Sequence, residues 1–151
     1  MLRTLLKERF HLVAHTENRE VPTYDLVVAK GGVKMLEHGT PAADGPQPER
    51  KKYPGVKNVG SMGGTLTTAQ IAYYLSGPAG RPVVDKTGLA GRWDYFISYM
   101  PTLPTDGDAA EVGPPDLFTA VQEGMGLKLQ PSKAEMSVVV VEHMDRMPTE
   151  N

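Results

Sequence analysis

The chain has 151 residues, of which 40% are hydrophobic and 23% are charged, with a formal net charge of −2 and no cysteine. A chain of this size can bury a hydrophobic core, and the lack of cysteine excludes disulfides, thiolate metal sites and a cysteine nucleophile. The near-neutral charge argues against a nucleic-acid-binding protein, and no apolar run reaches the roughly 20 residues of a membrane span.

The first predicted unit occupies residues 2–29. Leu2, Leu5, Leu6 and Phe10 have helical spacing, and the alternation that follows predicts a half-buried strand up to His15. The polar stretch after it predicts a turn, and a second apolar run predicts a returning strand. This unit is therefore predicted to be a helix followed by a β-hairpin.

A stretch rich in glycine and proline follows, and we expect a loop over about residues 36–64. Its residues 60–64 read Gly-Ser-Met-Gly-Gly, which is similar to the Gly-x-Ser-x-Gly elbow of esterases only superficially, because residue 59 is Val and no strand clearly precedes it. A flexible glycine loop leading into the next helix is the favoured interpretation.

The second predicted unit has the same order of elements. Thr67 and Gln70 match a capping box, and the helix is expected to end at Gly77 and Pro78. Residues 81–86 and 92–100 then predict two strands around a turn.

The third predicted unit follows a second expected loop at about residues 101–115. Two prolines and Asp116 suit the first turn of a helix over residues 117–125. Two strands, separated by a turn at residues 131–133, are predicted after it. Three helix-plus-β-hairpin units together predict an α+β fold, an antiparallel sheet with the helices packed on one face, in one domain over residues 1–151.

The histidines supply single candidate bases. His11 and His15 would lie about 13 Å apart along a strand, which is too far for one zinc ion. His15 beside Glu17 and His143 beside Glu142 are candidate general bases, and a solvated or capping role is the alternative.

An acidic segment supplies the metal candidate. Asp106, Asp108 and Glu111 lie within six residues around a glycine, a pattern that suits a hard cation such as Ca²⁺. The spacing is not that of an EF-hand loop, so an ordinary acidic surface loop is the alternative.

Residues 81–94 form the most structured run. Asp85 is predicted at a strand end, where its carboxylate would either shape the following turn or act as a base. Trp93, Tyr95 and Tyr99 share one face of the next strand, and that face would either line an apolar pocket or join the core.

The chain resembles a family of soil-associated proteins of unknown function, of the Solibacter type, expanded in Acidobacteria. The matching segments are residues 1–6, 9–10, 15–17, 20–24, 26–32, 81–91, 117–120, 126–129 and 148–151. Members of the family usually begin with an export signal and a further β-rich segment, and both are missing before Met1. The resemblance therefore implies the C-terminal portion of a secreted or periplasmic protein, although this chain itself has no signal peptide. An open sheet edge left by the missing segment would favour a homodimer.

The resemblance also implies an activity, since the chain is similar to a metagenome-derived member of that family that hydrolyses N-acyl-homoserine lactones. A lactonase of this kind would hold Ca²⁺ with Asp106, Asp108 and Glu111, and Asp85 or His15 would accept a proton from water. The partner would be a small acyl lactone. The alternative is a non-catalytic exported module that binds a partner or peptide through a sheet edge.

Overall fold

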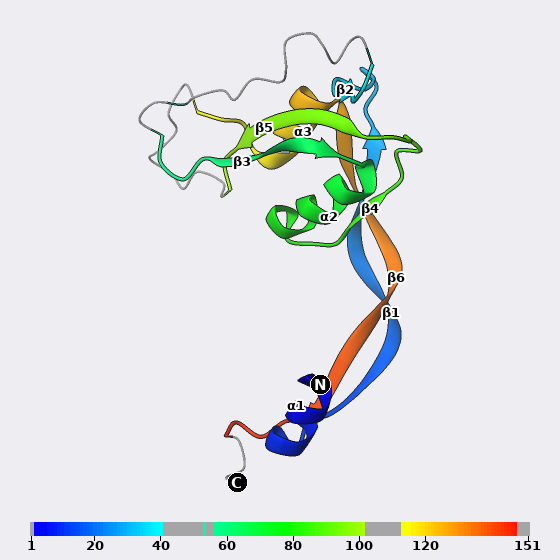
Figure 1. The fold of residues 1–151 in the computed structure, drawn as a ribbon, viewed down its shortest axis with the longest axis vertical. Helices are drawn as coiled ribbons and strands as arrows, with labels where there is room; N and C mark the ends of the chain where they lie inside the picture. Colours follow the sequence, from blue (N-terminus) through cyan, green and yellow to red (C-terminus); the bar gives the residue numbers. More distant parts are fainter. Residues whose placement is uncertain (1, 41–52, 54–55, 102–112, 148–151) are drawn as a thin grey trace. The chain divides into compact units, whose positions relative to one another are not determined.

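The computed structural model describes residues 2–40, 53, 56–101 and 113–147. In chain order, the elements of Figure 1 are α1 (Leu2–Phe10), β1 (Val13–Val28), β2 (Leu36–Glu37), β3 (Gly60–Leu66), α2 (Thr68–Ala79), β4 (Val83–Asp85), β5 (Trp93–Tyr99), α3 (Leu117–Met125) and β6 (Leu127–His143). The α+β class and the places of the three helices are confirmed.

The strands form two three-stranded sheets instead of one antiparallel sheet. The first has the order β4-β1-β6, with β4 parallel to β1, and the second has the order β2-β5-β3 and is antiparallel. The strands β4 and β5 are consecutive in the chain but belong to different sheets, so the predicted hairpin between them is wrong. Pairing between distant strands cannot be seen in local periodicity, which explains the error.

The two other predicted hairpins are single long strands. The strand β1 runs through the polar residues 16–20, and β6 runs through Pro131. The polar stretch contains neither glycine nor proline, so nothing in it forces a turn. Because β6 is an edge strand, a proline without an N–H group can be accommodated there. Helix-plus-hairpin repeats are therefore absent from the part of the chain that the structure describes.

The predicted loop over residues 36–64 contains two strands, β2 and β3. The glycines of β3 are required by its partner strand, because a Cβ at Gly60 would lie 2.7 Å from the ring of Tyr99. A Cβ at Gly63 would likewise collide with the ring of Phe96. These glycines allow aromatic rings of β5 to cover β3, so they are strand residues and not a flexible loop.

The helix α2 has the predicted start and a later end. The side chains of Thr67 and Gln70 form the capping box. The helix continues past Gly77 and Pro78 and ends at Gly80, whose φ of 69° is the left-handed conformation that glycine tolerates.

Contacts divide the chain into two compact units. Unit 1 comprises Met1–Val21 and Lys133–Asn151, and unit 2 comprises Pro22–Ser132, so β1 and β6 each contribute to both. The single domain over residues 1–151 stays a prediction.

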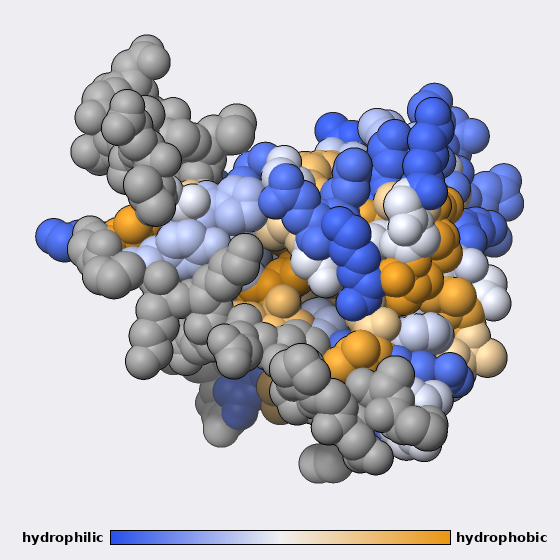
Figure 2. Space-filling model, turned by 90° about the horizontal axis from the view of Figure 1, so that it is seen from above, coloured by the Kyte–Doolittle hydropathy of each residue, from blue (hydrophilic) through white to orange (hydrophobic). Residues whose placement is uncertain are grey.

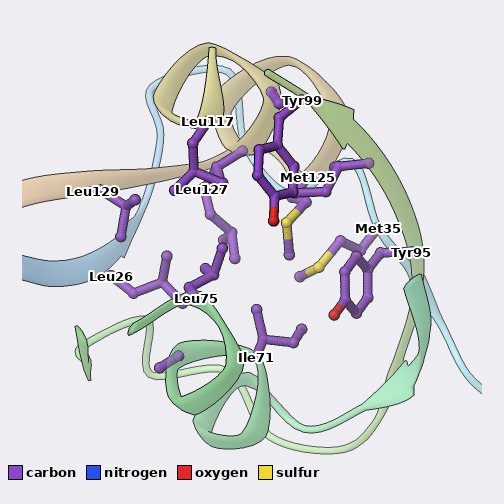
Figure 3. Packing of buried hydrophobic residues seen from close by; sticks show 14 residues of the cluster. Leu26, Met35, Ile71, Leu75, Tyr95, Tyr99, Leu117, Met125, Leu127 and Leu129 are labelled. Atoms are coloured by element: carbon purple, nitrogen blue, oxygen red, sulfur yellow. The ribbon is translucent and has the colours of Figure 1, made fainter. Parts of the chain in front are cut away.

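The hydrophobic core lies in unit 2. Figure 3 shows side chains of α2, α3 and β5 converging on it, together with those of Leu26, Met35, Leu127 and Leu129. On the face shown in Figure 2, the remaining apolar surface is divided into patches among hydrophilic residues. Every buried apolar residue of the described chain belongs to unit 2.

Unit 1 has a different construction. It combines α1 with the first part of β1 and the last part of β6, and these strand segments form a two-stranded antiparallel ribbon. The N–H of Asp145 donates to the carbonyl of Phe10 at 2.8 Å, and Lys133 forms an ion pair with Glu20 at 3.1 Å.

Candidate functional site

A histidine and an aspartate form a pair on the sheet β2-β5-β3. The Nδ1 atom of His38 lies 3.0 Å from Oδ2 of Asp94, whereas the Oγ1 hydroxyl of Thr65 donates to Oδ1 of the same carboxylate at 2.5 Å. An ionised carboxylate only accepts, so the proton of the imidazole must be on Nδ1. The Nε2 atom of His38 is then left with a lone pair.

The environment keeps the carboxylate of this pair charged. Asp94 is 7% exposed, and the hydrogen bonds from Thr65 and His38 hold its pKa below the usual value despite the opposing effect of burial. The charge of Arg92 acts in the same direction, as does that of His38 when its imidazole is protonated. The side chain of His38 is 56% exposed, so water can reach it. A buried carboxylate that orients an accessible imidazole is an arrangement that suits general-base catalysis.

The pair faces away from the core. Strand residues alternate between faces, so Asp94 shares the outer face of β5 with Phe96 and Ser98, whereas Tyr95 and Ile97 face the core. The pairing of β3 with β5 sets Thr65 directly opposite Asp94, which explains why its hydroxyl reaches the carboxylate.

A pocket of about 120 Å³ lies along the same strand. Its lining includes Phe96, Ile97 and Ser98 from β5 together with residues of α3, but neither His38 nor Asp94. This volume is below the roughly 300–1,000 Å³ of ligand pockets, so it suits a small ring or a part of a ligand.

Asp85 lies at the end of β4 and shapes the following turn, which is one of the two roles that the sequence offered for it. Its Oδ1 atom accepts from the N–H of Thr87 at 3.0 Å and from the Thr87 hydroxyl at 2.7 Å. Burial raises the pKa of Asp85, but the hydrogen bonds from Thr68 and Thr87 outweigh it, and the net shift is downward. The carboxylate is thus engaged in shaping the turn, and its catalytic role stays a prediction.

The other predicted base, His15, lies in unit 1 among carboxylates. Its Nδ1 atom is 2.8 Å from Oε1 of Glu142, and its Nε2 atom is 3.4 Å from Oε2 of Glu17. The imidazole is 48% exposed. With both ring nitrogens facing carboxylates, no lone pair is directed freely to solvent in this arrangement, and the role of His15 as a base also stays a prediction.

A third cluster links the two strands of the ribbon at one end. Asp145 lies 2.7 Å from Nδ1 of His11 and 3.0 Å from Nε2 of His143, and these contacts lower the pKa of its carboxyl. Among the described residues, no group of three or more histidines and carboxylates is arranged to hold a metal ion. The predicted calcium ligands Asp106, Asp108 and Glu111 lie outside the described residues.

Comparison with known protein families identifies the family of this chain. A family model described as a protein of unknown function, DUF3738, matches residues 1–144. The chain belongs to this family. The match confirms a family of unknown function, while no curated protein and no solved structure gives a significant match. The helices described for this DUF3738 chain are too short or too polar to cross a lipid bilayer.

The aromatic face of the DUF3738 chain is largely core. Tyr95 and Tyr99 are 4% and 8% exposed, and Trp93 is half-buried with its Nε1–H donating to the carbonyl of Ala90. This is the core alternative that the sequence offered for these residues, so the two tyrosines do not line an open apolar pocket.

Sequence reasoning missed the pair of His38 and Asp94 because 56 positions separate them. One signal was available: Asp94 stands between Trp93 and Tyr95 inside a run with strong strand propensity, where aspartate is depleted. An acidic residue in such a strand needs hydrogen-bond partners, and partners can be named only once the neighbouring strands are known.

Proposed function

We propose that this DUF3738 protein opens the lactone ring of N-acyl-homoserine lactones, with His38 and Asp94 as the general-base pair. The observation that carries the proposal is the 3.0 Å contact between a nearly buried carboxylate and an imidazole that stays open to water. The resemblance described above suggests the substrate class.

The chemistry needs one proton acceptor. Nε2 of His38 takes a proton from water as the water oxygen adds to the lactone carbonyl carbon, and the charged Asp94 stabilises the imidazolium that forms. The ester C–O bond of the ring then breaks, and the departing alkoxide recovers the proton to give the N-acyl-homoserine.

Calcium is a second part of the proposal. The carboxylates of Asp106, Asp108 and Glu111 would supply the oxygen ligands that Ca²⁺ prefers, and a bound ion would polarise the lactone carbonyl. This part rests on the sequence, and its test is independent of the histidine. Loss of turnover on chelation, recovery with Ca²⁺ and loss in the triple variant D106A/D108A/E111A are the expected results.

The test of the base is a comparison of four variants. Lactone hydrolysis by purified protein is expected to fall by about 10²–10⁴-fold in both His38→Gln and Asp94→Asn, because each removes the base or its orienting charge. His11→Gln, which changes an exposed histidine of unit 1, is the matched control and should retain turnover. Thr65→Val should give a smaller loss, since the carboxylate keeps its histidine.

Variants of the bases predicted from the sequence define the result that would contradict this assignment. If Asp85→Asn or His15→Gln abolishes turnover while His38→Gln leaves it unchanged, the pair of His38 and Asp94 is not the base. Turnover indistinguishable from buffer in the unmodified protein would overturn the lactonase altogether.

The alternative is a non-catalytic exported module that binds a peptide through a sheet edge. The edge position of β6 favours it, since an extended peptide can add a strand there. Peptide binding together with no lactone hydrolysis would support this alternative.

A further inference from the structure

The ribbon of unit 1 has an unpaired edge with strong strand propensity. In the described sheet order β4-β1-β6, the strand β6 has a neighbour on one side alone. Residues 138–141 of β6 are four consecutive valines. Such an edge presents free N–H and C=O groups to any strand that can pair with it.

Two apolar side chains stand among the exposed residues of this edge. Val139 and Val141 are 69% and 54% exposed, and alternate residues of β6 from Lys133 onward are exposed on the same face. Unit 1 contributes no buried apolar residue to the described core. A two-stranded ribbon without a core is marginally stable alone, so pairing would stabilise unit 1 through backbone hydrogen bonds and cross-strand side-chain contacts.

We propose that β6 pairs antiparallel with β6 of a second copy of this chain, about a two-fold axis at Val139. Counting outward from Val139 sets Ser137 opposite Val141 of the other copy, and then Glu135 opposite His143. The next pair would set Lys133 opposite Asp145, which lies two residues beyond β6, is half-buried and contacts His11 and His143 of its own chain. Within β6, a carboxylate thus faces a basic side chain once on each side of the axis.

Other registers lose this complementarity. Sliding one copy by two residues sets either Lys133 opposite His143 or Glu135 opposite Asp145, which are pairs of the same charge type. Sliding by one residue would set the exposed face of one strand beside the half-buried face of the other. The charges therefore favour pairing with a second copy of the chain in one register. An unrelated peptide would not need charges related by this two-fold symmetry.

The test uses the absence of native cysteine. In Val139→Cys the two introduced thiols face each other across the axis, within the Cα separation that a disulfide needs. In the control Val141→Cys the two thiols are offset by four residues, about 13 Å along the strand. With oxidised glutathione as the oxidant, two thiols give one disulfide and the glutathione is reduced. Covalent dimer should form about tenfold faster, or more, in Val139→Cys.

A second measurement needs no covalent chemistry. The unmodified protein should sediment as a dimer, and Val139→Lys should shift it to monomer because two ammonium groups would meet at the axis. Tyr73→Lys changes a residue of unit 2 that is 75% exposed, and this variant should remain dimeric. Far-UV circular dichroism distinguishes dissociation from unfolding in each variant.

Three outcomes would overturn the proposal. They are a monomer at every concentration, a dimer that Val139→Lys leaves intact, and equal cross-linking of Val139→Cys and Val141→Cys. A monomeric chain that captures an added peptide along β6 would assign the edge to another partner. None of these measurements reads lactone hydrolysis, so their failure is separate from failure of the proposed activity.

Discussion

At Gly124, a steric clash with one neighbouring side chain should outweigh the higher helix propensity of alanine. Inside an open helix, replacement of glycine by alanine stabilises by about 1 kcal/mol. In α3, however, a Cβ at Gly124 would lie 2.7 Å from Cγ2 of Ile97, which is a methyl group on a stiff, β-branched side chain that is 3% exposed. We therefore expect Gly124→Ala to lower the free energy of unfolding by about 1–3 kcal/mol, measured by urea denaturation.

The control for Gly124 removes the obstructing methyl group. In an Ile97→Leu background, Cγ2 is gone and the volume is kept, so Gly124→Ala should cost less there than in the unmodified protein. Equal costs in both backgrounds would show that the contact with Ile97 does not explain the glycine.

Among single residues, the sequence predicted those whose partners are close in the chain. The turn around Asp85 and the helix start at Asp116 each depend on residues two or three positions away. The pair of His38 and Asp94 depends on a third strand carrying Thr65, and a local pattern contains no such information. Local hydrogen bonding is therefore predictable where tertiary pairing is not.

For helices and strands, too, the sequence predicts local features but not distant partners. The starts of α2 and α3 follow from caps and apolar spacing, and both lie where the sequence placed them. Strand partners do not follow, because β1 pairs in parallel with β4 across more than fifty residues. A chain segment has a strand or helix preference of its own, but its neighbour in a sheet is decided by the whole fold.

The buried and exposed faces of helix α2 should respond differently when a side chain is truncated to alanine. Leu75 is fully buried and Tyr73 is 75% exposed, two residues apart on one helix. Leu75→Ala should lower the free energy of unfolding by about 2–5 kcal/mol through lost burial and a cavity. Tyr73→Ala should change it by about 0.5 kcal/mol or less. Urea denaturation of both variants checks this, and similar losses would contradict the packing of α2.

For the whole molecule, acid should unfold the protein through carboxylates whose pKa is lowered. The hydrogen bond from Thr119 lowers the pKa of Asp116, and hydrogen bonds likewise give Asp85 and Asp94 a net downward shift. Such a group stabilises the fold above its unfolded pKa, near 3.8, and this contribution is lost as the pH falls through the lower native pKa. The free energy of unfolding should therefore decrease between about pH 5 and pH 2.

Asp116→Asn separates this effect from helix capping. Asparagine caps a helix about as well as aspartate, so the variant should differ from the unmodified protein at pH 7 by about 0.5 kcal/mol or less. Because an amide does not titrate in this range, the variant should lose less stability than the unmodified protein when the pH is lowered from 5 to 2. Urea denaturation at several pH values measures both slopes. An identical or steeper acid slope in the variant would mean that Asp116 has no lowered pKa in the fold, and that other carboxylates govern acid unfolding.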